Sequence, residues 1–182
     1  AVGGAGGVGS LVAWLCARVP GVEVELIDTA PARADLAAAL GLVHRLPGAA
    51  SGDRDLVFHA SGNPAGLVRA LELAGQDATV VEMSWYGSTA VSLPLGAAFH
   101  ARRLRLQSSQ VGHLPPQRGA RWDFRRRMEL ALALLVDPRL DALISGETDF
   151  NALPALMQRL AHAPAGALCE RIRYDASAPS IP

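Results

Sequence analysis

The sequence predicts an α/β protein with a doubly wound parallel sheet, a truncated first strand and a short C-terminal α/β appendage. Residues 4–9 form a glycine-rich loop that leads directly into an apolar, helix-like run. Strand-like and helix-like segments then alternate with short connections as far as Met83, which is the order of a parallel sheet. The pattern changes after Gly87. We therefore expect a main domain over residues 1–140 and a C-terminal segment over residues 141–182.

Hydrophobic periodicity and chain punctuation locate the elements of the first half. The expected order is a strand at residues 1–3, a helix at 8–19, a strand at 22–27, a helix at 31–40, a short strand at 42–46, a loop at 47–54, a strand at 55–60, a turn at 61–64, a helix ending at 73 and a strand at 78–83. Pro31 suits a helix start, where a missing N–H costs nothing, and Gly41 suits the position just past a helix end. The apolar run at 55–60 is typical of a buried parallel strand.

The second half gives less regular signals. Residues 93–99 are a short irregular or helical piece, and the alternating pattern at 103–108 suits an edge strand. We expect a helix over residues 122–136, with Phe124, Met128, Ala131 and Leu135 on one face. Strands at 140–145 and 167–173 are expected to flank a helix at 151–161.

The opening loop has the form G-x-G-x-x-G, in Gly4, Gly6 and Gly9, and Asp28 follows 19 residues after Gly9 at the end of the second predicted strand. This is the spacing of a βαβ unit that binds a dinucleotide. The glycines let the backbone approach a pyrophosphate, whose charge then lies on N–H groups at a helix N-terminus. The acid accepts hydrogen bonds from ribose hydroxyls. The sequence therefore predicts a dinucleotide site.

Composition excludes several other classes. The chain has 182 residues, half of them apolar, and a formal charge of zero, so nothing favours a nucleic acid or a membrane as partner. All 17 basic residues are arginine. The absence of lysine excludes a P-loop lysine, a Schiff-base lysine and the Tyr-x-x-x-Lys pair of short-chain dehydrogenases. The isolated Cys16 and Cys169 are expected to be buried, reduced thiols, which suits a cytoplasmic protein.

Taken together, the motifs resemble the zinc-type medium-chain alcohol dehydrogenase family, in its coenzyme domain and C-terminal segment. The similarity covers nearly all of the chain. The segments that carry it are the loop at 4–9, Asp28 with Arg33 five residues later, residues 55–62, residues 78–84, the strand at 104–110 and the closing residues 168–174.

The resemblance implies a set of NAD-binding residues. Backbone N–H groups of Gly7 and Val8 would hold the pyrophosphate, and Asp28 the adenosine ribose, with Arg33 beside it. Asp28 without a basic residue directly after it favours NAD over NADP. The remaining implied positions border the adenosine side or lie near the nicotinamide: they are Ser61 and Asn63, then Met83, Ser84, Ser108, Ser109 and Gln110.

One part of the family pattern is missing from this sequence. Family members bind a catalytic zinc through cysteine, histidine and acidic residues of a domain that precedes the coenzyme domain. No histidine or cysteine here has metal-ligand spacing, and His59 is expected to be a satisfied core or groove histidine. We therefore predict no metal ligand and no catalytic residue in this chain, and interpret it as a fragment or truncated product. The family also implies a homodimer formed through the edge strand.

Three alternatives remain open. A zinc-independent reductase of the same wider family is one, although such enzymes usually prefer NADPH, which Asp28 disfavours. A non-catalytic NAD-sensing domain is another. A methyltransferase-like domain also has a glycine loop and an acid after the second strand, but the predicted helix at 122–136 argues against its terminal hairpin.

Overall fold

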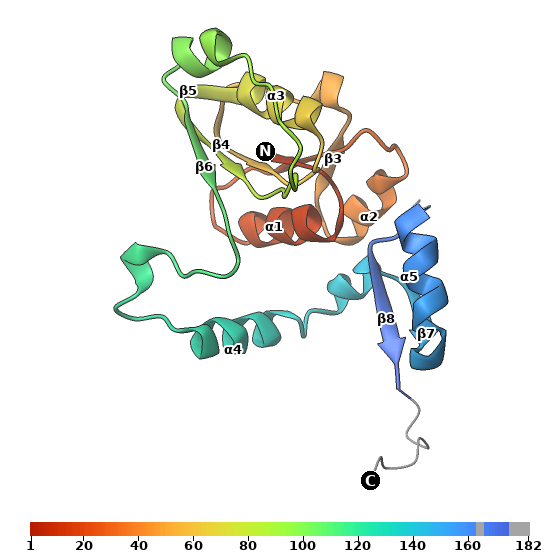
Figure 1. Cartoon of the computed structure of the whole chain (residues 1–182). Coiled ribbons are helices and arrows are strands. Elements are labelled where there is room, and N and C mark those ends of the chain that lie inside the picture. Colours follow the sequence, from red (N-terminus) through yellow and green to blue (C-terminus); the bar gives the residue numbers. More distant parts are fainter. Residues whose placement is uncertain (163–165, 175–182) are drawn as a thin grey trace. The chain divides into compact units, whose positions relative to one another are not determined.

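The computed structural model describes residues 1–162 and 166–174 (Figure 1). The chain divides into two compact units, Ala1–Asp137 and Pro138–Pro182. In the described residues, no helix combines the length and the apolar character needed to cross a lipid bilayer.

The first unit is built on a six-stranded parallel sheet with the order β3-β2-β1-β4-β5-β6. The predicted doubly wound sheet is thereby confirmed. The strands are β1 (Val2–Gly3), β2 (Glu25–Ile27), β3 (Val43–Arg45), β4 (Arg54–His59), β5 (Ala74–Glu82) and β6 (Arg105–Ser108). Because the order reverses between β1 and β4, the crevice at the carboxyl ends of these two strands is the expected ligand position.

Helices cover the two faces of this sheet. They are α1 (Gly7–Ala17), α2 (Arg33–Ala39) and α3 (Pro64–Leu73). Right-handed crossovers that lead outward from β1 and from β4 in opposite directions place α1 and α2 on one face and α3 on the other (Figure 1). A core cluster joins α3 to β4 and β5, with Leu71, Val57 and Val80 almost fully buried.

Several element boundaries differ from the sequence predictions. β2 starts only at Glu25, since Gly21 turns the chain with a positive φ and the next residues are exposed. Conversely, β5 starts earlier than predicted, at Ala74, with an irregular pairing that accommodates a positive φ at Asp77. The strand at 55–60 is buried only at its carboxyl end, and Leu56 is 40% exposed.

The edge strand was predicted correctly, because β6 pairs with β5 alone and all four of its residues are exposed. A short π-helical turn, η2 (Leu95–Phe99), precedes it. The predicted helix at 122–136 is α4 (Phe124–Leu134), which Asp123 caps by accepting a hydrogen bond from the Arg126 N–H at 2.7 Å. None of its residues is buried, so its predicted apolar face is an exposed surface.

The second unit contains two parallel strands, β7 (Ile144–Asp149) and β8 (Cys169–Arg173), with α5 (Leu153–His162) between them in the sequence. The strand predicted at 140–145 is β7, but it begins only at Ile144, because Pro138 opens a 3₁₀ turn that lasts to Leu143. Leu140, Leu143 and Leu156 are buried in this unit. Cys169 is exposed, so its predicted burial was also wrong, whereas Cys16 is half-buried.

Candidate functional site

The three glycines of the opening loop have three different surroundings. Gly4 has φ +99°, and a Cβ built on it would lie 2.8 Å from the backbone nitrogen of Ser61. A Cβ on Gly9 would overlap the carbonyl oxygen of Gly4. A Cβ on Gly6, in contrast, would meet no atom within 4 Å and would extend into open space. These surroundings match the tight turn, the close helix–strand packing and the exposed backbone that are expected of a G-x-G-x-x-G loop.

The loop leads into an uncovered helix N-terminus. α1 begins at Gly7, and its cap, Gly6, contributes no side-chain hydrogen bond. The N–H groups of a first helical turn have no partner within the helix and carry partial positive charge. Val8 is 57% exposed, so this turn is open to solvent. The N–H groups of Gly7 and Val8 can therefore take an anion.

Asp28 lies at the carboxyl end of β2, beside the loop. Its Oδ2 accepts a hydrogen bond from the Ala5 N–H at 2.7 Å, and its Oδ1 accepts one from the Ala30 N–H at 2.9 Å. A carboxylate has about four acceptor positions, so each oxygen keeps capacity for a further donor. The two backbone hydrogen bonds fix the carboxylate next to the glycine turn and leave it able to accept further hydrogen bonds.

A cavity of about 480 Å³ lies at this edge of the sheet. Six of the predicted residues line it, namely Gly4, Gly6, Asp28, Arg33, Ser61 and Asn63. Its apolar wall includes Ile27, Val57 and Leu73. A concave, mostly apolar space with a few convergent polar groups is typical of a small-molecule site.

Sequence reasoning missed one basic residue of this cavity, Arg69 on α3. Its Nε donates to the Pro47 carbonyl at 3.1 Å and its Nη1 pairs with Glu72 at 2.9 Å. Arg69 lies six residues after Asn63, which is not a repeat of one helix face, so the motifs gave no signal for it. Arg33 and Arg69 offset the charge of Asp28 in the cavity wall.

The other predicted residues lie outside the cavity. Gly7, Val8 and Gly9 belong to α1, next to Gly6. Met83 follows β5 and Ser109 follows β6, and each continues the hydrogen-bond ladder of the sheet. The Met83 N–H donates to the His59 carbonyl and the Ser109 N–H to the Glu82 carbonyl. Ser108 ends β6, and Gln110 bonds through its side chain to the Gly112 N–H. These residues share the carboxyl edge with the cavity but do not line it.

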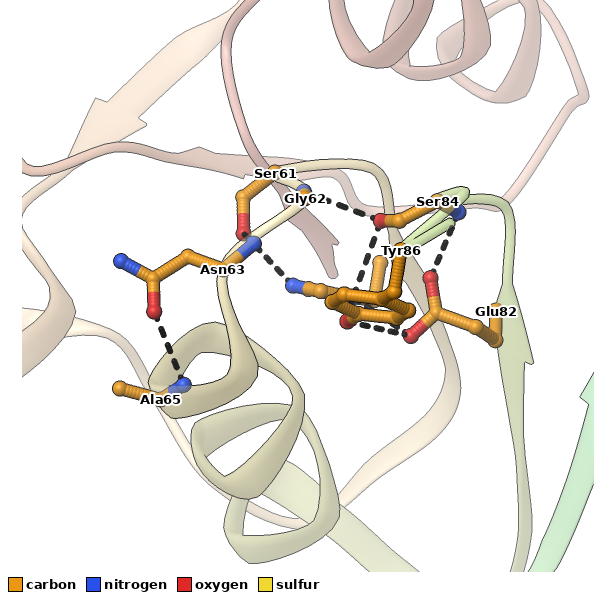
Figure 2. Close-up of polar contacts among 8 residues, drawn as sticks. Ser61, Gly62, Asn63, Ala65, Glu82, Ser84 and Tyr86 are labelled. Atoms are coloured by element: carbon orange, nitrogen blue, oxygen red, sulfur yellow. Dashed lines mark hydrogen bonds and ion pairs between the residues drawn. The ribbon is translucent and has the colours of Figure 1, made fainter. Parts of the chain in front are cut away.

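A polar network joins the ends of β4 and β5 (Figure 2). His59 is fully buried, with its Nδ1 2.7 Å from Glu82 Oε2 and its Nε2 2.6 Å from Ser61 Oγ. The Tyr86 hydroxyl donates to Glu82 Oε2 at 3.1 Å, and Ser84 Oγ accepts from the Gly62 N–H at 3.0 Å. The prediction that His59 is a satisfied buried histidine is confirmed. The sequence analysis assigned no site role to Glu82 or Tyr86.

A second cavity, of about 420 Å³, lies at the opposite edge of the sheet. Its lining includes Ala1, Gly21 and Asp55, which precede or begin strands. Ligands of open parallel sheets bind outside the carboxyl ends of the strands, so this amino-edge cavity is not the candidate site. Within residues 1–162 and 166–174, no three His, Cys, Asp or Glu side chains gather in a way that could hold a metal ion.

Several solved structures that share this fold are dehydrogenases. L-idonate 5-dehydrogenase from Escherichia coli aligns with 94% of this chain at a TM-score of 0.73 and 19% identity. An alcohol dehydrogenase from a Thermus species aligns with 96% of it at 0.71 and 21%. An alcohol dehydrogenase from Escherichia coli complexed with NADH aligns with 94% of it at 0.68 and 18%. The chain has the fold of these dehydrogenases.

The chain spans only about half the length of these structures, 48% of the first and 50% of the other two. A zinc-binding dehydrogenase from Clostridium scindens gives the same picture, with 94% of this chain matching 48% of that one at a TM-score of 0.71 and 16% identity. No protein-family model and no curated protein matches the sequence.

Proposed function

We propose that the chain is the NAD-binding part of an oxidoreductase similar to the zinc-type medium-chain alcohol dehydrogenases. The observation that carries the proposal is the combination of an open Gly6, an uncovered α1 N-terminus and a fixed Asp28 around one cavity. The fold match to dehydrogenases, one of them complexed with NADH, supports it.

The residues present fit the cofactor. The pyrophosphate lies against the N–H groups of Gly7 and Val8, since Gly6 leaves room for its approach. The adenosine ribose donates hydrogen bonds to the free acceptor positions of Asp28, and the base occupies the apolar part of the cavity near Arg33. Ser61 borders the adenosine side of the cavity. Met83, Ser84 and Ser108–Gln110, at the carboxyl ends of β5 and β6, would border the nicotinamide half. Once bound, the nicotinamide accepts a hydride from an alcohol or donates one to a carbonyl compound.

Asp28 also sets the preference for NAD over NADP. Its carboxylate is an acceptor beside two ribose hydroxyls, whereas a 2′-phosphate would bring negative charge against it. This preference distinguishes the proposal from a zinc-independent reductase of the wider family, which would bind NADPH more tightly than NADH.

The zinc of such an enzyme is assigned to residues outside this chain. The described residues offer no ligand cluster for it, and the chain spans about half of its structural neighbours. The C-terminal segment, residues 141–182, is proposed to pack on that additional part. A non-catalytic NAD-sensing domain is the alternative in which no such part exists. Turnover of an alcohol by the intact gene product would exclude it.

The free edge of β6 is the proposed homodimer contact. All four residues of this strand are exposed, and the strand has a neighbour on one side only. Two such edges that pair about a two-fold axis continue the sheet from one subunit to the next.

Titration calorimetry with NAD tests the proposed site. Asp28→Ala removes the ribose acceptor, and we expect it to weaken NAD binding by about tenfold or more, because a hydrogen bond to a charged group contributes about 1.5–3 kcal/mol. Asp35→Ala, which removes an exposed acid of α2, is the matched control and should leave the affinity unchanged. Equal affinities of the Asp28→Ala and original proteins would refute the assignment of Asp28.

A further inference from the structure

The proposed NAD site does not explain why a fully buried histidine and a glutamate lie beneath it. His59 and Glu82 form a hydrogen-bonded chain that ends at Ser61, a residue of the cavity wall (Figure 2). Buried ionisable groups cost free energy compared with the apolar side chains that usually fill a strand end. The chain of bonds has a definite direction, and that direction determines what Ser61 offers to a ligand.

The direction starts at Glu82. Its Oε1 accepts the Ser84 N–H at 2.6 Å, and its Oε2 accepts the Tyr86 hydroxyl at 3.1 Å. Burial and the adjacent Glu82 carboxylate raise the pKa of Tyr86 to about 12, so this phenol keeps its proton and acts as the donor. An ionised carboxylate can only accept hydrogen bonds. The third contact of Glu82, at 2.7 Å, therefore requires a proton on His59 Nδ1.

The position of the His59 proton in turn determines the orientation of the Ser61 hydroxyl. A neutral imidazole with its proton on Nδ1 has an acceptor at Nε2, and the only group there is the Ser61 hydroxyl at 2.6 Å. Ser61 must then donate its proton inward, to His59. Its oxygen also accepts the Asn63 N–H at 3.2 Å. What the Ser61 oxygen has left is an acceptor position.

That acceptor position has space in front of it. Ser61 and Gly66 both line the cavity, and a Cβ on Gly66 would lie 2.6 Å from Ser61 Oγ. Gly4 separates Ser61 from the carboxylate of Asp28, with a built Cβ at 2.8 Å from the Ser61 backbone. The cavity thus presents two acceptors on either side of the glycine turn.

We propose that His59 and Glu82 are positioning residues that hold Ser61 as a hydrogen-bond acceptor, and that Ser61 is a second determinant, beside Asp28, of a preference for a ribose with free hydroxyls over a 2′-phosphorylated ribose. Hydroxyls can donate to both acceptors, whereas a phosphate has no proton for either. This inference rests on the proposed function, because it assigns a further specificity residue to the same site.

Glu82→Gln tests the inference with almost no change of shape. The Ser84 N–H requires an acceptor, so the amide oxygen takes the Oε1 position and the NH₂ group takes the Oε2 position. The NH₂ group donates one proton to His59 Nδ1, which moves the imidazole proton to Nε2, and its other proton to the Tyr86 hydroxyl, which rotates to accept it. His59 then donates to Ser61, and the Ser61 hydroxyl turns its proton toward the cavity. At about pH 8, where imidazole is neutral, we expect the ratio of NAD to NADP affinity to fall about tenfold.

Three further variants separate this effect from a general loss of structure. Ser61→Ala should lower the ratio of NAD to NADP affinity about threefold on its own, and Glu82→Gln should have no further effect on the ratio in the Ser61→Ala background. Glu129→Gln, an exposed change of the same type on α4, should leave the ratio unchanged. Unaltered ratios in both Glu82→Gln and Ser61→Ala would overturn the inference.

A nitrogen-15 NMR spectrum of the histidines gives a readout that needs no ligand. We expect His59 to carry its proton on Nδ1 in the original protein and on Nε2 in Glu82→Gln. A proton on Nε2 in the original protein would overturn the inference whether or not NAD binds. If the tautomers are as expected but neither dinucleotide binds the original protein, the proposed function is refuted, and the ligand assignment of Ser61 is refuted with it.

Discussion

At the scale of single residues, the glycines of the opening loop are not equivalent. Gly4 and Gly9 lack a Cβ because the chain itself occupies the space, at the Ser61 backbone and at the Gly4 carbonyl. Gly6 faces open space, so the folded chain alone does not require a glycine there. Because Gly6 also lines the cavity, a ligand that approaches its backbone would explain the glycine.

This difference predicts opposite phenotypes for two substitutions. Gly6→Val should weaken NAD binding by about tenfold or more, because its side chain extends into the space assigned to the pyrophosphate. Its unfolding free energy should fall by about 1 kcal/mol or less, which is the cost of a poorer cap on α1. Gly9→Ala should instead destabilise the fold by about 1–3 kcal/mol, since α1 must move away from the Gly4 carbonyl.

Urea unfolding and calorimetric titration with NAD, applied to both variants, check this pair. Gly48→Ala provides a control, because a Cβ at Gly48 also meets no atom within 4 Å and Gly48 does not line the cavity. Unimpaired NAD binding by Gly6→Val would contradict the position assigned to the pyrophosphate.

At the scale of elements, β1 is short and contributes only Val2 and Gly3 to the sheet. At the amino edge, its neighbours β2 and β4 are also joined by a cluster of side chains around Glu25. Glu25 of β2 accepts hydrogen bonds from the N–H and hydroxyl of Ser51 at 3.0 and 3.1 Å, and pairs with Arg54 of β4 at 2.8 Å. Arg45 of β3 lies 3.6 Å from the same carboxylate. This cluster connects three strands where backbone pairing with β1 is short.

The cluster predicts an acid-sensitive contribution to stability. Burial disfavours the Glu25 carboxylate, but the two Ser51 bonds and Arg54 outweigh burial and lower the pKa of Glu25. A carboxyl group whose pKa is lowered by folding stabilises the protein above its unfolded pKa, about 4.3 for glutamate, and loses that contribution as pH falls through the folded value. Glu25→Gln should flatten this part of the curve of unfolding free energy against pH. Urea titrations between about pH 2 and 7 measure it, and an unchanged curve would show that the cluster is not coupled to folding.

The local hydrophobic pattern predicted most elements because residues that favour the start or end of an element lie beside it. Pro64 and the Asn63 side chain, which accepts the Ala65 N–H at 2.9 Å, start α3 where the turn was predicted. Predicted element boundaries were wrong where backbone geometry that the hydrophobic pattern does not encode sets the start of an element. The 3₁₀ turn after Pro138 is an example. Asp28 was found from motif spacing, and Ser61 and Asn63 from the family resemblance. Glu82 and Tyr86 join them only through contacts around a buried histidine.

At the scale of the whole molecule, the sheet has one edge at β3 and one at β6. An edge strand presents unpaired backbone groups that can pair with another chain. Ser109 donates its N–H to β5, and residues of a parallel strand alternate in direction, so the N–H of Leu106 faces away from β5. The proposed dimer uses this outward-facing N–H.

Leu106→Pro is therefore expected to give a folded monomer. Proline removes the outward N–H and leaves the hydrogen bonds between β6 and β5 in place, which is the position where an edge strand tolerates it. Leu106→Ala keeps the N–H and should remain a dimer, so it separates the backbone effect from loss of the exposed leucine. Sedimentation velocity gives the oligomeric state, and circular dichroism verifies that both variants fold. A monomeric original protein would refute the β6 contact. A folded Leu106→Pro variant that remains a dimer would place the dimer contact on another surface, and the exposed apolar face of α4 is the next surface to test.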